Sequence, residues 1–252
     1  MTDIITEQNI GSELLPFNPE DYSLKEVLNP KHSALLVVDM QNDFLSSKGF
    51  FATRPEIPGS VDQMQSTVPF IQGLMEAARK SHVPVILTKG YEDVKFRKPG
   101  PDLRRAVVWQ ERDGDPDGIN SKQDSWGAEF YEGIEPVEGD IIVEKHKWSA
   151  FDGKDMDGKG LKEILERMGV KTLVVTGVVA ETCIETTIRD GYDQDFFIVV
   201  PRNSIGSNQE DQLSVRMKYW EAGFLSDVVD EEVVKENWII PENREEQVEN
   251  SQ

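Results

Sequence analysis

The only cysteine of this 252-residue chain, Cys183, lies where a nucleophile could be placed. A β-branched apolar run over 172–179 precedes it, and residues 182–192 show helical spacing, which predicts a strand-to-helix turn. Backbone N–H groups at the first turn of a helix favour an anion, so we expect this thiol to ionise below its ordinary pKa of about 8.5. A thiolate attacks carbonyl carbon; the alternative interpretation is a small buried residue without a chemical task.

An acid and a lysine stand at the ends of two other predicted strands. Asp39 follows the apolar residues ALLVV, and burying a lone carboxylate costs several kcal/mol unless something compensates it. Lys145 and Lys147 end the segment DIIVEKHK, so both could point to one face, and either could be a buried cation or a solvated side chain. An acid beside a thiol can take its proton and a lysine can hold the thiolate, so these strand ends predict a nucleophilic site.

The other chemical motifs of the chain are weaker. The segment DGKDMDGKG (152–160) resembles a calcium loop, but Gly153 and Ile164 stand at ligand positions, so we interpret it as a charged turn. The three histidines are scattered without metal-ligand spacing, which argues against a zinc site. No GxGxxG follows a strand and no GxxxxGK[ST] occurs, so nucleotide binding has no support.

Hydrophobic patterning predicts the elements that position these residues. Apolar runs of strand length alternate with helical spacing, which is typical of an α/β protein with a doubly wound parallel sheet. The predicted strands are 32–40, 84–88, 140–146, 172–179, 194–200 and 224–229, and the predicted helices are 68–78, 160–168, 182–192 and 213–220.

The length and composition predict one large domain with flanking segments. Residues 31–240 form that domain, and residues 1–30 form a polar N-terminal arm over the body or a neighbouring subunit. An insertion rich in Gly, Pro and charge at about 90–139 is expected to act as a lid or pocket wall. The acidic tail 241–252 has almost no apolar content and is expected to be disordered.

The formal net charge of −20 argues against nucleic acid or an anionic membrane as a partner and leaves a small-molecule substrate. A lone cysteine suits a reducing cytosol, and the polar start has no apolar signal core, so we expect a cytoplasmic protein. No apolar run reaches the length of about 18 residues that a membrane span needs.

Three segments together closely resemble the isochorismatase-like cysteine hydrolase family: ALLVVDMQNDFL (34–45), VEKHKWSAF (143–151) and TGVVAETCIETTIRDGYD (176–193). The resemblance runs from about residue 32 to 230 and implies a six-stranded parallel sheet with helices on both faces. It implies a catalytic triad of Asp39, Lys145 and Cys183, with Lys145 rather than Lys147 in the family position. It also implies a cis peptide bond at 178–179 and an oxyanion hole formed by the N–H groups of Val179 and Cys183.

Within the family, the chain looks most like the ureidoacrylate, biuret and carbamoylsarcosine amidohydrolases. The metal-binding histidines of nicotinamidases are missing, and isochorismate-cleaving members lack the cysteine that is present here. The segment PRNSIGS (201–207) departs from the relatives, many of which have an acidic residue followed by alanine there. The resemblance marks Asn42, Phe44, Lys89 and Tyr91 as candidate substrate-binding residues, with Tyr91 over a planar ureido group and Lys89 facing the substrate's charge.

The sequence therefore predicts a cysteine-dependent amidohydrolase that releases ammonia from a small linear amide or ureido compound through a covalent acyl-enzyme. No metal or organic cofactor is expected, and a homo-oligomer, either a dimer or a tetramer, is expected. The alternatives are an isochorismatase-type or nicotinamidase-type hydrolase of another small molecule, or a non-catalytic oligomeric scaffold.

Overall fold

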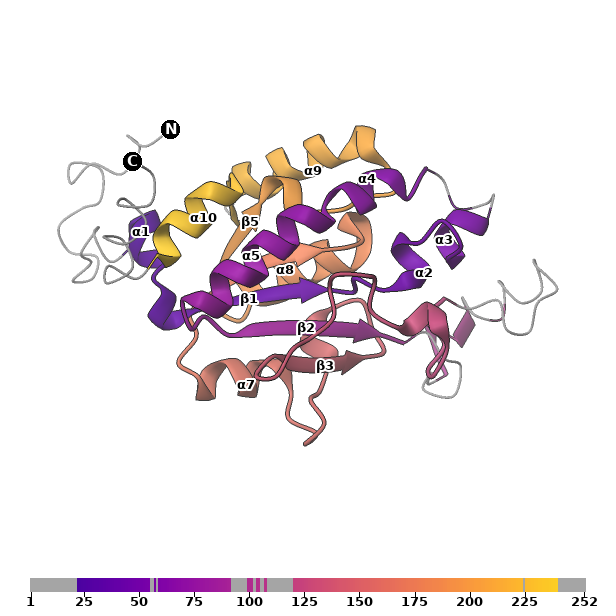
Figure 1. Cartoon of the computed structure of the whole chain (residues 1–252), viewed down its shortest axis with the longest axis horizontal. Coiled ribbons are helices and arrows are strands. Elements are labelled where there is room, and N and C mark those ends of the chain that lie inside the picture. Colours follow the sequence, from indigo (N-terminus) through magenta and orange to yellow (C-terminus); the bar gives the residue numbers. More distant parts are fainter. Residues whose placement is uncertain are drawn as a thin grey trace.

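A six-stranded parallel sheet in the order β3-β2-β1-β4-β5-β6 forms the centre of the molecule (Figure 1). The structure is a computed structural model that describes residues 22–54, 57, 59–91, 99–101, 103–104, 107, 120–223 and 225–239. The strands are β1 (Ser33–Val38), β2 (Val85–Gly90), β3 (Ile141–Lys145), β4 (Thr172–Gly177), β5 (Phe197–Pro201) and β6 (Asp227–Val229). The predicted fold class is confirmed.

The sheet is covered on both faces, which explains why its central strands are apolar without alternation. Every residue of β1 and β4 is buried. Leu36 and Val38 of β1 pack into one hydrophobic cluster, and Leu35 and Val37 pack into the other. Two hydrophobic cores therefore share one sheet.

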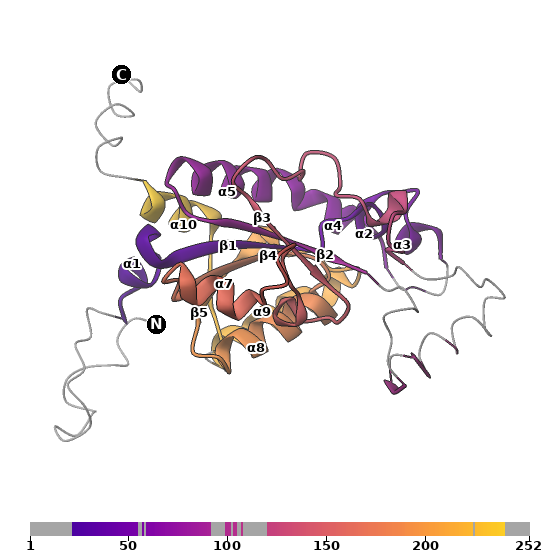
Figure 2. The ribbon, with the colours of Figure 1, turned by 90° about the horizontal axis from the view of Figure 1, so that it is seen from below.

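Figure 2 shows the resulting three layers, with α5 and α10 on one side of the sheet and α7, α8 and α9 on the other. The long helices are α5 (Val68–Lys80), α7 (Leu161–Arg167), α8 (Glu185–Tyr192), α9 (Glu210–Ala222) and α10 (Glu231–Trp238). Their buried residues recur at helical spacing, as in Ile71, Leu74, Met75 and Ala78 of α5. The shorter helices are α1 (Leu24–Val27), α2 (Asn42–Leu45), α3 (Phe50–Thr53) and α4 (Asp62–Ser66).

The N-terminal boundary of the domain differs from the predicted arm. Residues 24–27 form α1, and Val27 and Leu28 are buried in the cluster that includes Leu35. The sequence pattern does not predict this packing, because only two apolar residues are buried here and the residues around them are polar. The rest of the predicted arm, residues 1–21, lies outside the described residues, as does the predicted tail 241–252.

The predicted lid is described at its ends and, between them, only at residues 99–101, 103–104 and 107. Residues 120–139 lie against the start of the domain: Ser121 N–H donates to Asp43, and Tyr131 N–H donates to the carbonyl of Met40. Much of 92–119 lies outside the described residues, so a lid function stays a prediction. Within the described part of the chain, no helix is both long and apolar enough to cross a membrane.

The strand order reverses between β1 and β4, which run side by side from Ser33↔Thr172 to Val38↔Gly177. From this point the chain crosses over to opposite edges of the sheet, so the loops that leave the two carboxyl ends diverge, and parallel sheets generally bind ligands at such a point. Asp39 directly follows β1, and the segment with Cys183 directly follows β4. The fold thus brings together two of the residues that the sequence singled out.

Candidate active site

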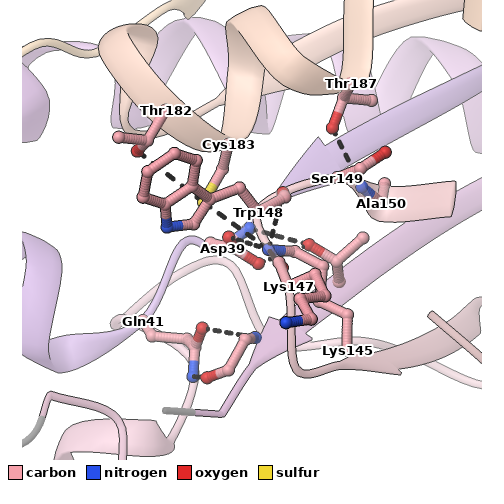
Figure 3. Close-up of polar contacts among 12 residues, drawn as sticks. Asp39, Gln41, Lys145, Lys147, Trp148, Ser149, Ala150, Thr182, Cys183 and Thr187 are labelled. Atoms are coloured by element: carbon pink, nitrogen blue, oxygen red, sulfur yellow. Dashed lines mark hydrogen bonds and ion pairs between the residues drawn. The ribbon is translucent and has the colours of Figure 1, made fainter. Parts of the chain in front are cut away.

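Asp39, Lys145 and Cys183 meet at the carboxyl ends of β1, β3 and β4 (Figure 3). Lys145 Nζ lies 2.7 Å from Asp39 Oδ2 and 3.5 Å from Cys183 Sγ. The side chains of Lys145 and Asp39 are only 2% and 1% exposed, and Cys183 is also buried. A charged pair so well removed from water interacts strongly with any charge that develops on the sulfur.

Backbone carbonyls complete the surroundings of the buried lysine. Lys145 Nζ donates to the carbonyl oxygens of Lys147 at 2.9 Å and Trp148 at 3.0 Å. The side chain of Lys147 is exposed, so the alternative left open by the two-residue spacing is settled by burial. Lys145 is the buried cation.

Asp39 is fixed by the end of the neighbouring strand. Its backbone N–H donates to Thr88 Oγ1, and the Thr88 hydroxyl donates to Asp39 Oδ1 at 2.6 Å. Asp39 itself has a φ of 51°, in the left-handed region that few non-glycine residues adopt. Such a backbone state persists only where surrounding contacts determine it, and Thr88 supplies two of them.

Cys183 lies in a wide helical turn rather than in the first turn of an ordinary α-helix. Residues Ala180–Ile184 form a single π-helical turn, η6, and α8 follows directly. Single π turns occur often at functional sites. The Val178–Val179 peptide bond before this turn is cis, and Ala180 N–H donates to the carbonyl of Gly206.

The resting thiol differs from the sequence-based expectation. The surroundings raise the pKa of Cys183 to about 12: burial raises it most, Lys145 partly opposes this, and the Asp39 carboxylate adds to the rise. The sequence predicted a lowered thiol pKa because Cys183 was placed at a helix start. In the folded site the pKa is raised instead, because desolvation disfavours the thiolate more than one cation favours it. For Lys145, burial alone would lower the pKa, but the Asp39 carboxylate and Cys183 raise it above its ordinary value. The site therefore rests as a neutral thiol beside an ammonium and a carboxylate.

Two polar residues of the site were not singled out from the sequence. Thr88 ends a strand that otherwise reads as apolar, which was the available signal. Gln41 is fully buried; its amide donates to the carbonyls of Gly90 and Ala128, and its Oε1 accepts from Gly90 N–H at 2.9 Å. Gln41 thereby ties the loop after β1 to the end of β2 beside Asp39 (Figure 3).

Asn42 and Phe44, two of the candidate substrate-binding residues, lie on α2 and serve packing in this structure. Asn42 Nδ2 donates to the carbonyl of Trp126 at 2.9 Å. Phe44 is buried in a hydrophobic cluster, with its ring centroid 5.0 Å from that of Phe51. A role for either in substrate binding stays a prediction.

Lys89 and Tyr91, the other two candidates, already have protein partners. Lys89 Nζ lies 3.3 Å from a carboxylate oxygen of Glu129 and 5.0 Å from the ring centroid of Phe130. The Tyr91 hydroxyl donates to Glu144 at 3.1 Å, and burial, followed by the Glu144 charge, raises its pKa. A substrate that uses Lys89 would therefore compete with Glu129.

The described residues contain no group of three or more His, Cys, Asp or Glu side chains that is arranged to hold a metal ion. In the segment that resembles a calcium loop, Asp155 Oδ1 accepts from the backbone N–H groups of Asp157 and Lys159, as in a turn.

A family model and curated relatives match most of this chain. The family model described as "Isochorismatase domain" matches residues 33–229. A ureidoacrylate amidohydrolase of Enterobacter sp. (strain 638) is 29% identical over 193 residues, which cover 74% of this chain and 78% of that protein. A ureidoacrylate amidohydrolase of Caulobacter segnis is 26% identical over 204 residues, covering 78% and 80%.

Solved structures share the fold. A cysteine hydrolase from Pseudomonas syringae pv. phaseolicola 1448A superposes with a TM-score of 0.67 at 23% identity, covering 83% of this chain and 93% of that one. An N-carbamoylsarcosine amidase from Thermoplasma acidophilum does so with a TM-score of 0.60 at 24% identity, covering 79% and 96%. At these identities the likeness concerns the fold alone.

Proposed function

The chain belongs to the isochorismatase domain family, and we propose that it is a cysteine-dependent amidohydrolase that releases ammonia from a small linear amide or ureido compound. One observation carries this proposal. A buried thiol lies 3.5 Å from a buried ammonium that is itself 2.7 Å from a buried carboxylate. Nucleophilic catalysis at a carbonyl carbon needs this set: a nucleophile, a base for its proton and a fixed positive charge.

In the first half of the reaction, Cys183 Sγ forms a bond to the substrate's carbonyl carbon while Asp39 accepts the thiol proton. The raised pKa of Cys183 explains why a base is needed, since little thiolate exists before the substrate binds. Lys145 stabilises the developing negative charge. The carbon–nitrogen bond then breaks, and Asp39 returns the proton to the departing ammonia, leaving a thioester or thiocarbamate on Cys183.

In the second half, water attacks that acyl group while Asp39 takes a proton from the water; the carbon–sulfur bond then breaks, and Asp39 gives this proton to the departing sulfur to regenerate the thiol. The carbonyl oxygen carries negative charge in both halves. We assign its stabilisation to the backbone N–H groups of Val179 and Cys183, at the two sides of the turn that the cis Val178–Val179 bond introduces.

A ureido acid or a related carbamoyl compound is the substrate class we favour. The relatives named ureidoacrylate amidohydrolase support this choice, because their similarity covers about three quarters of this chain. In these compounds a planar carbonyl carries an NH2 leaving group, which the chemistry above converts into ammonia.

The test is ammonia release from a panel of ureido acids, biuret, carbamoyl amino acids and nicotinamide, with wild-type protein and with Cys183→Ala and Cys183→Ser. Both variants are expected to lose at least about a thousandfold in turnover. Acid-quenched wild type should carry the mass of the acyl group on Cys183. Substantial activity without the thiol would remove the mechanism.

The same panel separates the alternatives. Loss of nicotinamide hydrolysis on adding a chelator, with recovery on adding zinc or iron, would favour a nicotinamidase-type enzyme. Absence of turnover on every compound, with a folded protein, would favour the non-catalytic scaffold.

A further inference from the structure

Two glutamates flank the cysteine at equal distance along the chain. Glu181 and Glu185 lie two residues before and two residues after Cys183, one on η6 and the other at the start of α8. Their side chains are only 11% and 22% exposed. Like charges four residues apart on one side of a helical turn repel each other, and partial burial strengthens that repulsion. The turn that holds Cys183 therefore depends on positive charge from elsewhere.

Arg216 of α9 supplies that charge to both glutamates. Its Nη1 donates to Glu185 Oε2 at 2.7 Å, and its Nε lies 3.8 Å from Glu181 Oε1. A planar guanidinium can face two carboxylates at once, which a point charge such as lysine does less well. Arg216 thus bridges the two sides of the turn around the thiol.

The helix that carries Arg216 is firmly anchored. Leu213, Met217 and Trp220 of α9 are buried in the same hydrophobic cluster as Cys183 and Ile184. Because these residues fix α9 against the cysteine segment, Arg216 is presented from a rigid element.

Two further groups contact the glutamates: Ser207 shares Glu181 Oε1 with Arg216, and Arg189 takes the other oxygen of Glu185, whereas Glu181 Oε2 is buried without a hydrogen-bond partner among the described residues. The Ser207 hydroxyl makes a short hydrogen bond to Glu181, and Ser207 N–H donates to Gln63 Oε1 at 2.6 Å. Arg189 donates to Glu185 Oε1 through Nη2 at 2.8 Å. The network therefore connects the cysteine turn to the chain after β5 as well as to α9.

We propose that Arg216 is a positioning residue, which holds the turn Ala180–Ile184 in the shape that keeps Cys183 Sγ beside Asp39 and Lys145. Arg216 touches neither the thiol nor its two partners by any described contact, so it acts through Glu181 and Glu185. The catalytic consequence rests on the proposed function, whereas the effect on the position of the thiol does not.

The first readout is the steady-state kinetics of Arg216→Met with whichever compound of the panel above wild type turns over. Without the guanidinium the two glutamates repel, the turn relaxes, and kcat is expected to fall about tenfold or more, since small misplacements of reacting groups are costly. Arg216, Glu181 and Glu185 make no described contact with the candidate substrate-binding residues, so KM should stay within about twofold. Arg216→Lys should recover part of kcat, because lysine keeps the positive charge but lacks the planar guanidinium that faces both carboxylates.

The second readout is the alkylation rate of Cys183 with iodoacetamide as a function of pH, which is specific because the chain has no other cysteine. The charged groups that act on the thiol are Lys145 and Asp39, and the charged groups on or against its turn are Glu181, Glu185, Arg189 and Arg216. In wild type, burial raises the pKa of the thiol to about 12. In Arg216→Met the alkylation midpoint should move down toward the ordinary value of about 8.5, as the thiol leaves its buried place.

The matched control is Arg202→Met, because Arg202 makes an exposed 3.7 Å ion pair with Asp230 and has no described contact with the cysteine turn. It should leave kcat and the alkylation profile unchanged. If Arg216→Met does not fold, as judged by thermal unfolding, Glu181→Gln replaces it and should lower kcat severalfold while still accepting from Ser207.

A folded Arg216→Met with the kcat and the alkylation profile of wild type would overturn the proposal. So would an Arg202→Met whose loss of kcat equals that of Arg216→Met. An unchanged alkylation profile together with a raised KM would also overturn it, since it would assign Arg216 to substrate binding. If no substrate is turned over, the alkylation profile alone still decides whether Arg216 positions the thiol.

Discussion

Lys145 and Lys147 lie two residues apart, yet only Lys145 is buried against Asp39 and Cys183. Removing its ammonium leaves a buried carboxylate unpaired and removes the fixed charge beside the sulfur. We therefore expect Lys145→Ala to lower turnover by at least about a hundredfold, and Asp39→Asn to do the same because it removes the base.

Lys147→Ala is the matched control, because the exposed Lys147 side chain is removed while its backbone carbonyl still accepts from Lys145. Turnover measured on the three purified variants should single out Lys145 and Asp39. The reverse pattern, a damaging Lys147→Ala and a harmless Lys145→Ala, would contradict the assignment.

Pattern alone left Lys145 and Lys147 open and the family resemblance selected Lys145, but the proximity of Asp39, a lysine and Cys183 could be predicted from the sequence, because they stand at or after the ends of three predicted strands and the strand ends of a parallel sheet lie at one edge. The ionisation of Cys183 could not. A local argument from the helix start favoured the thiolate, whereas the folded site buries the sulfur beside a carboxylate and raises its pKa to about 12. Burial is a property of the assembled core, which the local pattern does not contain.

At the scale of elements, the long periodic segments were predicted well and the short ones poorly. The helix predicted over 68–78 is α5, and the strand predicted over 194–200 begins later, at Phe197, because residues 194–196 complete the turn after α8. Helix α10 was missed, since its buried Val234 and Trp238 are separated by charged residues. Short helices such as α2 have too few residues to show a period.

The ends of β1 and β4, which lead to Asp39 and to the cysteine turn, approach each other closely at Gly177. This residue has a φ of 111°, and a Cβ there would lie 2.1 Å from the carbonyl oxygen of Val38. Gly177→Ala should therefore separate the strand ends that carry Asp39 and Cys183. We expect it to destabilise the fold by at least about 3 kcal/mol, as steric overlap adds to the cost of the left-handed backbone.

Gly139→Ala isolates the backbone cost alone, because Gly139 has a similar φ of 97° but nothing within 4 Å of its Cβ position. It should cost only about 1–2 kcal/mol. Denaturant unfolding of both variants measures the difference. Equal destabilisation would show that the contact with Val38 relaxes without cost and that the strand ends tolerate separation.

At the scale of the whole molecule, the net charge of −20 opposes the approach of an anionic ureido acid. Salt screens this repulsion, since the Debye length falls from about 30 Å at 0.01 M to about 8 Å at 0.15 M ionic strength. We expect kcat/KM for an anionic ureido acid to rise over this range, while kcat/KM for neutral biuret stays constant. A fall for the anion would show that a local cationic region dominates its approach.

Lys89 and Glu129 provide a local test of the same charge balance. Their side chains pair at 3.3 Å, with Lys89 15% exposed and Glu129 60% exposed, so Glu129 is the solvent-facing partner. If Lys89 binds the substrate's carboxylate, Lys89→Met should raise KM for an anionic ureido acid by about tenfold, equivalent to about 1.4 kcal/mol. Glu129→Gln should lower the same KM, because it releases Lys89 from its competitor. Neither variant should alter KM for biuret. If both variants change KM for the ureido acid in the same direction, or if either variant affects both substrates equally, Lys89 serves only to pair with Glu129.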